Sequence, residues 1–153
     1  MLPYLTALHV SIVVLWIGGV AFVTMIIFPM LLKMEESLEK VMMFQRVENA
    51  FARHARIYAW LTGLTGGVLL WLTGQHAALF TRDTAGVTVM IAVWIAYVLV
   101  LSFEKRLFGI IFSGRKELEP SRVFFRLSAF HWIVLGLSMA AVFLGVLAGH
   151  GGL

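Results

Sequence analysis

Long apolar stretches, separated by two segments rich in basic residues, dominate the pattern of this chain. Four runs contain no Asp, Glu, Lys or Arg: Met1 to Leu32, Ile57 to Thr81, Thr84 to Phe103 and Leu127 to Leu153. About 20 helical residues cross the ~30 Å hydrocarbon core of a bilayer, and each run is at least that long. The pattern therefore predicts four transmembrane helices.

The composition agrees with a membrane protein. Of the 153 residues, 61% are hydrophobic and only 13% are charged, and the mean hydropathy is +0.94. These values are far more apolar than those of a soluble domain. We therefore expect an all-α integral membrane bundle that forms a single domain over residues 1–153. The first run is too long for the apolar region of a signal peptide and no basic residue precedes it, so we expect it to be retained.

The basic residues predict how the bundle is oriented. Five of the 12 lie between Lys33 and Arg56, six lie between Lys105 and Arg126, and the last is Arg82. Short segments rich in Lys and Arg stay in the cytoplasm. We therefore expect both termini outside, both basic segments inside, and a location in the bacterial inner membrane. The sequence pI near 9.9 follows from this topology and does not indicate a nucleic-acid partner.

Two local patterns refine the helices. Apolar residues spaced three to four apart in the first basic segment predict an amphipathic helix that leads into the second span: Val41, Phe44, Val47 and Phe51. Pro29 predicts a kink near the inner end of the first helix. Glycines four apart predict close helix packing in the second and fourth spans: Gly63 with Gly67, and Gly145 with Gly149.

Histidines are the candidate chemistry, because the chain has no cysteine and a metal would need His, Met, Tyr or carboxylate ligands. His9 and His131 lie in apolar runs, where ionisable side chains usually face the bundle interior or a cofactor. Counting ~1.5 Å per residue, His54 and His131 share the cytoplasmic side, with an axial offset of ~10 Å. His9 and His76 share the outer side, together with His150, for which we expect a solvated terminal imidazole.

The inner histidines predict a haem b site. Neutral imidazole is a common axial ligand of haem iron, and a four-helix bundle can hold a porphyrin between facing helices. His54 and His131 form the leading pair, and Trp132 beside His131 is a candidate wall for the porphyrin. Four basic residues lie close enough in the sequence to neutralise the propionates: Arg53, Arg56, Arg122 and Arg126.

The outer histidines leave several alternatives open. His9 with His76 would form a second haem site or a copper site, and Met90 or Met139 could supply a thioether to either metal. A copper-handling or transport protein would use this outer side. In a purely structural or assembly subunit, the imidazoles would only form hydrogen bonds between helices.

The stretch "LHVSIVVLWIGGVAF", residues 8–22, resembles the first helix of the copper-resistance D (CopD) superfamily and of the related HemJ-type protoporphyrinogen oxidases. In these families a Leu-His pair precedes a Trp and small residues about two turns later, here His9, Trp16, Gly18 and Gly19. The resemblance extends loosely through residues 51–74 and through the layout of four helices. It implies b-type haem binding or copper handling, with His9 as the first-helix histidine. HemJ-type proteins carry a lysine early in the third helix, and residues 84–103 have none, so the resemblance does not extend to porphyrinogen oxidation.

These observations together predict a cytochrome-like electron carrier with one or two haems b, which exchanges electrons with a quinone or a partner protein. Two strong axial ligands leave no open position on the iron, and this suits electron transfer better than gas chemistry. The chain would then be an electron-transfer component or an oxidoreductase. We also expect a homodimer, because four short spans shield a large cofactor poorly.

Overall fold

The computed structural model describes residues 1–81, 84–113 and 120–149, and every regular element in these ranges is a helix. The predicted solvated state of His150 lies outside the described residues. The elements are α1 (Leu2–Phe22), the π-helical turn η1 (Val23–Ile27), α2 (Phe28–Lys33), α3 (Leu38–Leu72), the 3-10 helix η2 (Gln75–Ala78), α4 (Ala85–Ser113) and α5 (Pro120–Gly149).

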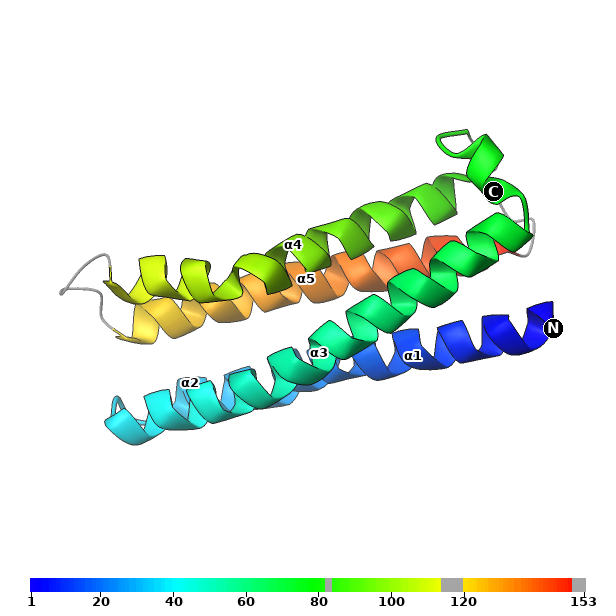
Figure 1. Cartoon of the computed structure of the whole chain (residues 1–153). Helices are drawn as coiled ribbons and strands as arrows, with labels where there is room; N and C mark the ends of the chain where they lie inside the picture. Colours follow the sequence, from blue (N-terminus) through cyan, green and yellow to red (C-terminus); the bar gives the residue numbers. More distant parts are fainter. Residues whose placement is uncertain (82–83, 114–119, 150–153) are drawn as a thin grey trace.

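The helices form two antiparallel pairs that lie against each other (Figure 1). α1 packs mainly on α3, and α4 packs mainly on α5. α1 begins and α5 ends at the same end of the bundle, which we call the terminal end. The turn from α2 to α3 lies at the other end together with the start of α5. We call this the basic end, because the two basic segments of the sequence meet there.

Among the described residues, three helical stretches are long and apolar enough to cross a membrane: Leu2–Lys33, Ala85–Phe103 and Arg122–Ala148. They correspond to the first, third and fourth predicted spans. The second predicted span, Ile57 to Thr81, is not among them. Its helix, α3, ends at Leu72, and a turn at Gly74 with a positive φ of 72° leads into η2. The charge-free run therefore continues nine residues beyond the end of the helix, which Thr73 and Gly74 terminate.

The predicted amphipathic segment is confirmed as the first half of α3. Ser37 caps this helix, since its side chain accepts a hydrogen bond from the Lys40 backbone N–H at 3.3 Å. Phe44 is buried, and three further apolar residues pack against the same core: Val41, Val47 and Phe51. In the first span the π-helical turn Val23–Ile27 comes just before Pro29, and the predicted kink stays a prediction.

Glycines mark close contacts, but not always where the spacing predicts them. A Cβ on Gly63 would collide with the Trp94 indole, and a Cβ on Gly145 would collide with the Met90 thioether. Gly67, in contrast, has nothing within 4 Å of the position of a Cβ. The closest approach of two backbones is at Gly86, where a Cβ would lie 2.5 Å from the Leu144 carbonyl oxygen. Gly86 therefore lets α4 cross α5 closely near the terminal end.

The largest apolar cluster lies at the basic end and joins η1, α2, α3 and α5. It comprises Val23, Ile27, Phe28, Leu31, Phe44, Val123, Phe124 and Leu127. Lys40 is buried beside it, with its Nζ 2.8 Å from Glu36 Oε1 and 5.0 Å from the centre of the Phe124 ring. The cation–π contact therefore joins the start of α3 to α5, and the ion pair joins it to the turn before α3.

Candidate metal centre

His9 is held by the neighbouring helix. Its Nδ1 lies 2.8 Å from Thr65 Oγ1 on α3, and Thr65 Oγ1 in turn donates to the Leu61 carbonyl at 2.7 Å. A hydroxyl has one hydrogen, so Thr65 accepts from His9 and His9 Nδ1 carries the proton. We assign this tautomer from the hydrogen-bond network. In the neutral ring, Nε2 then has a free lone pair, which is the state that binds a metal.

His54 and His131 have the same tautomer for a simpler reason. His54 Nδ1 lies 2.8 Å from the Ala50 carbonyl oxygen, and His131 Nδ1 lies 2.9 Å from the Leu127 carbonyl oxygen. Each partner is four residues earlier on the same helix. A carbonyl oxygen only accepts, so both Nδ1 atoms are donors and both Nε2 atoms keep their lone pairs in the neutral ring. A fixed hydrogen bond on the other ring nitrogen is typical of metal-binding histidines.

The surroundings of these two histidines differ. His131 is half-buried, with the Phe28 ring at 4.6 Å and the Phe130 ring at 5.8 Å between centroids. His54 is exposed, and its ring lies 6.5 Å from that of Tyr58. In the part of the chain that the structure describes, no hydrogen bond or ring contact joins His54 to His131. Their joint coordination of one iron remains a prediction.

His76 lies in η2 at the terminal end. Its ring stacks on Trp71 with a centroid distance of 4.6 Å and an interplanar angle of 14°, and its Nδ1 lies 3.4 Å from the Leu70 carbonyl oxygen. Both His76 and Trp71 are exposed. The two histidines of this predicted pair therefore have different environments: the His9 ring lies between α1 and α3, and the His76 ring lies on the surface.

The four predicted propionate-binding arginines are all exposed, and they divide into two groups. Arg53 and Arg56 flank His54 on α3, and Arg56 Nε donates to the Ala52 carbonyl at 3.2 Å. On α5, ~100° per residue places Arg122 about 180° and Arg126 about 140° away from His131 around the helix axis. The arginines of α5 and His131 are therefore on different sides of the same helix, which the linear spacing does not reveal.

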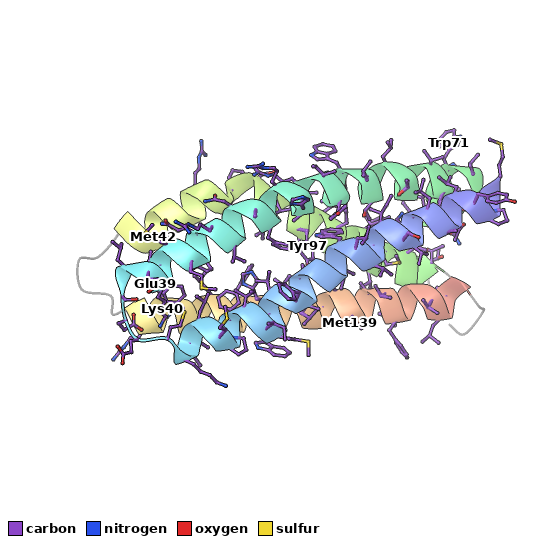
Figure 2. All side chains as sticks on the ribbon, turned by 90° about the horizontal axis from the view of Figure 1, so that it is seen from below. Glu39, Lys40, Met42, Trp71, Tyr97 and Met139 are labelled. Atoms are coloured by element: carbon purple, nitrogen blue, oxygen red, sulfur yellow. The ribbon has the colours of Figure 1, made fainter. Side chains whose placement is uncertain are left out.

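Trp132 is also separated from His131 by the helix. It is 49% exposed and lies on the outer surface of α5, while His131 faces Phe28. The two candidate thioether ligands, Met90 and Met139, have different surroundings. Met90 packs against Gly145, and Met139 is 55% exposed and projects outward from α5 (Figure 2).

Polar residues between the helices form a feature that the sequence analysis missed. Tyr97 points into the bundle (Figure 2), and its hydroxyl lies 2.9 Å from Ser138 Oγ on α5. Trp94 Nε1 donates to the Ala59 carbonyl on α3 at 2.8 Å. Thr65, the partner of His9, belongs to this set. The threonines at positions 62 and 65 were the available signal, since residues three apart share one face of a helix.

Two buried polar atoms near this region have no hydrogen-bond partner among the described residues: Trp16 Nε1 and Thr62 Oγ1. Trp16 is 4% exposed and Thr62 is 8% exposed. The Trp16 ring meets the Tyr97 ring edge-on at 4.5 Å. Buried polar atoms without a hydrogen-bond partner are uncommon in folded proteins.

Within the described ranges, no three side chains of His, Asp or Glu come together as a metal-binding group. The histidines instead occur singly on four different elements: His9 on α1, His54 on α3, His76 on η2 and His131 on α5. Comparison of the chain with models of known families, with curated proteins and with solved structures finds no match.

Proposed function

We propose that this chain is a membrane protein that binds haem b through histidine axial ligands and carries electrons to or from a quinone or a partner protein. One observation carries the proposal. His9 and His131, which lie inside apolar spans, each have Nδ1 tied to a fixed oxygen, and this leaves the Nε2 lone pair for a metal. An apolar span tolerates such a side chain best where it binds a cofactor or lies between helices.

Single histidines on separate helices fit a haem. The porphyrin supplies four nitrogens and a redox-active iron, so the chain needs to provide only one or two imidazoles. The Leu127 carbonyl fixes the ring of His131, and Thr65 fixes the ring of His9. Imidazoles held in this way would keep their orientation during electron transfer, which limits the reorganisation of the site.

His54 and His131 remain the leading pair of this proposal, and His9, with or without His76, is the candidate for a second haem. Arg53 and Arg56 on α3 support the inner pair, because they lie beside His54 and would bind propionates. Arg122 and Arg126 support it less, since they lie across α5 from His131.

Copper handling is the second candidate, and it is favoured by the environment of His9. The one basic residue of the sequence outside the two inner segments is Arg82, so propionates near His9 would have few partners. A copper ion has no propionates, and it binds imidazole well. Copper would then use His9 Nε2, which Thr65 orients, together with ligands on the same side of the membrane.

The proposal includes four membrane crossings, with α3 as the second span, and both termini outside. α1 begins and α5 ends at the same end of the bundle (Figure 1), and this supports an even number of crossings. Eleven of the 12 basic residues lie in the two segments assigned to the inside of a bacterial inner membrane. Reporter fusions at Leu153 and Gly114 test this orientation. A cytoplasmic reporter at Leu153 would contradict it.

A homodimer is also part of the proposal. Only 6% of the Ala85–Phe103 span is buried in the single chain, compared with 33% of Leu2–Lys33. α4 therefore has the surface that a second copy would cover. The mass of the purified protein in detergent, corrected for bound detergent, tests for two copies.

Absorption spectra and metal analysis of the purified full chain test the function. The proposal predicts a Soret band, with the sharp α and β bands of low-spin haem b after reduction. Bound copper without a haem spectrum would support the second candidate. A colourless, metal-free protein from cells that make haem and are supplied with copper would contradict both, and would leave hydrogen bonding between helices as the role of the histidines.

A further inference from the structure

The basic end has a shallow, open depression between α2 and α5, with a volume of about 390 Å³. Its described lining consists of Leu32, Arg122, Phe125 and Arg126. The two guanidinium groups are four residues apart on α5, so they lie one turn apart on the same face. Phe125 is 67% exposed and Leu32 is 40% exposed, so an apolar surface adjoins the two charges.

This inference rests on the proposed topology, which places the depression at the level where lipid headgroups meet hydrocarbon. Leu32 is next to the last residue of the span Leu2–Lys33, and Arg122 is the first residue of the span Arg122–Ala148. Phe125 and Arg126 follow within the first five residues of that span. The boundary between water and acyl chains therefore passes through this site.

The chemistry of the lining suits a phosphate diester attached to acyl chains. Arginine binds phosphate through two parallel N–H···O bonds, which gives both affinity and geometry. The start of α5 adds the positive end of the dipole of a 30-residue helix.

We propose that this depression binds one anionic phospholipid, with Arg122 and Arg126 holding the phosphate and Phe125 and Leu32 contacting the acyl chains. A haem propionate is the competing occupant. The lipid fits better, because helix geometry places both arginines on the side of α5 away from His131. The exposed Phe125 and Leu32 side chains beside them also offer contacts to acyl chains. Basic pockets at the cytoplasmic side of transmembrane helices commonly bind such headgroups.

The test uses the full chain in nanodiscs and native mass spectrometry after release. The nanodiscs contain phosphatidylcholine with or without phosphatidylglycerol. We expect one retained phosphatidylglycerol per chain, and a loss of roughly tenfold or more in its retention for the double variant Arg122→Gln, Arg126→Gln. The matched control is Arg46→Gln, Arg106→Gln, which removes two exposed charges outside the depression, and we expect it to keep the lipid.

A charge-preserving variant separates specific binding from general attraction. Arg122→Lys, Arg126→Lys keeps both charges but loses the bidentate geometry, so we expect an intermediate loss of lipid. An equal loss in the control pair would show non-specific attraction and would overturn the proposal. The protein in phosphatidylcholine nanodiscs is also tested for retained inorganic phosphate. If phosphate is retained and its retention depends on Arg122 and Arg126, the ligand of this site is a free anion and the lipid proposal is wrong.

The lipid and haem proposals fail separately. If Arg122→Gln, Arg126→Gln lowers haem content while phosphatidylglycerol retention is unchanged, the arginines bind propionates and the lipid site is wrong. If the protein contains no haem but retains phosphatidylglycerol in an Arg122- and Arg126-dependent way, the lipid site stands alone. Helical circular dichroism of each variant checks that the bundle is folded.

Discussion

The basic end and the middle of the bundle are held together by different interactions. At the basic end, large rings pack on one another, with Phe28 5.9 Å from Phe44 and Phe44 5.3 Å from Phe124 between centroids. The middle has a smaller apolar cluster, and two of its five buried residues are the alanines Ala55 and Ala59. Polar contacts join the helices there instead, between His9 and Thr65, Trp94 and Ala59, and Tyr97 and Ser138.

This difference follows from where each region lies in the membrane. Lipid is as apolar as a leucine side chain, so in the hydrocarbon core helices associate through close packing and hydrogen bonds rather than through burial from water. In the proposed topology the basic end reaches the aqueous boundary, where burying Phe44 removes apolar surface from water. The basic end thus resembles the core of a soluble protein, and the middle uses polar contacts that also position His9.

The largest predicted loss of stability comes from a substitution in the apolar cluster at the basic end. Phe28 is fully buried, so Phe28→Ala removes a ring that contacts Phe44 and His131 and leaves a cavity. We expect a loss of about 3–5 kcal/mol in the free energy of unfolding. The free energy of unfolding is measured by circular dichroism while a denaturing detergent is added to the protein in a mild detergent. Phe143→Ala is the control, since Phe143 is 65% exposed. A similar loss of stability in this variant would show that packing at the basic end has no special weight.

A smaller effect is predicted at the partner of His9. Thr65→Val removes the hydroxyl that accepts from Nδ1, while Thr65→Ser keeps it. We expect Thr65→Val to weaken metal binding at His9 by about tenfold, the lower end of the range for such supporting partners, and Thr65→Ser to restore it. Nitrogen NMR of the His9 ring in metal-free protein gives an independent measure. A tautomer ratio that is the same in Thr65→Val and the parent would show that Thr65 does not orient the ring.

The smallest effect concerns the hydrogen bond between α4 and α5. Tyr97→Phe removes the hydroxyl that contacts Ser138 and keeps the ring that packs on Trp16. Hydrogen bonds between membrane helices contribute about 0.6 kcal/mol on average, so we expect a loss of that order in the free energy of unfolding. A double-mutant cycle with Ser138→Ala isolates the pair. A loss as large as that of Phe28→Ala would mean that polar contacts dominate both regions.

The sequence predicts the apolar helices well and the relation between them poorly. Charge-free runs located three spans, and the spacing from Val41 to Phe51 identified the buried face of α3. Rotation around each helix was not predicted, because spacing along the chain does not say which neighbour a face meets. This is why Arg126 looked close to His131 in the sequence but lies on another side of α5, and why Thr65 was missed.

Histidine ligation of haem iron is the central claim, and single-histidine variants test it most directly. The measurement is haem content with reduced-minus-oxidised spectra for His9→Ala, His54→Ala, His76→Ala and His131→Ala, each checked for expression in the membrane. An alanine methyl cannot bind iron, so loss of an axial ligand removes the haem or converts low-spin iron to high-spin. We predict this outcome for His54→Ala and His131→Ala. Unchanged spectra for those two would reject the inner site, and unchanged spectra for all four would contradict histidine ligation in this protein.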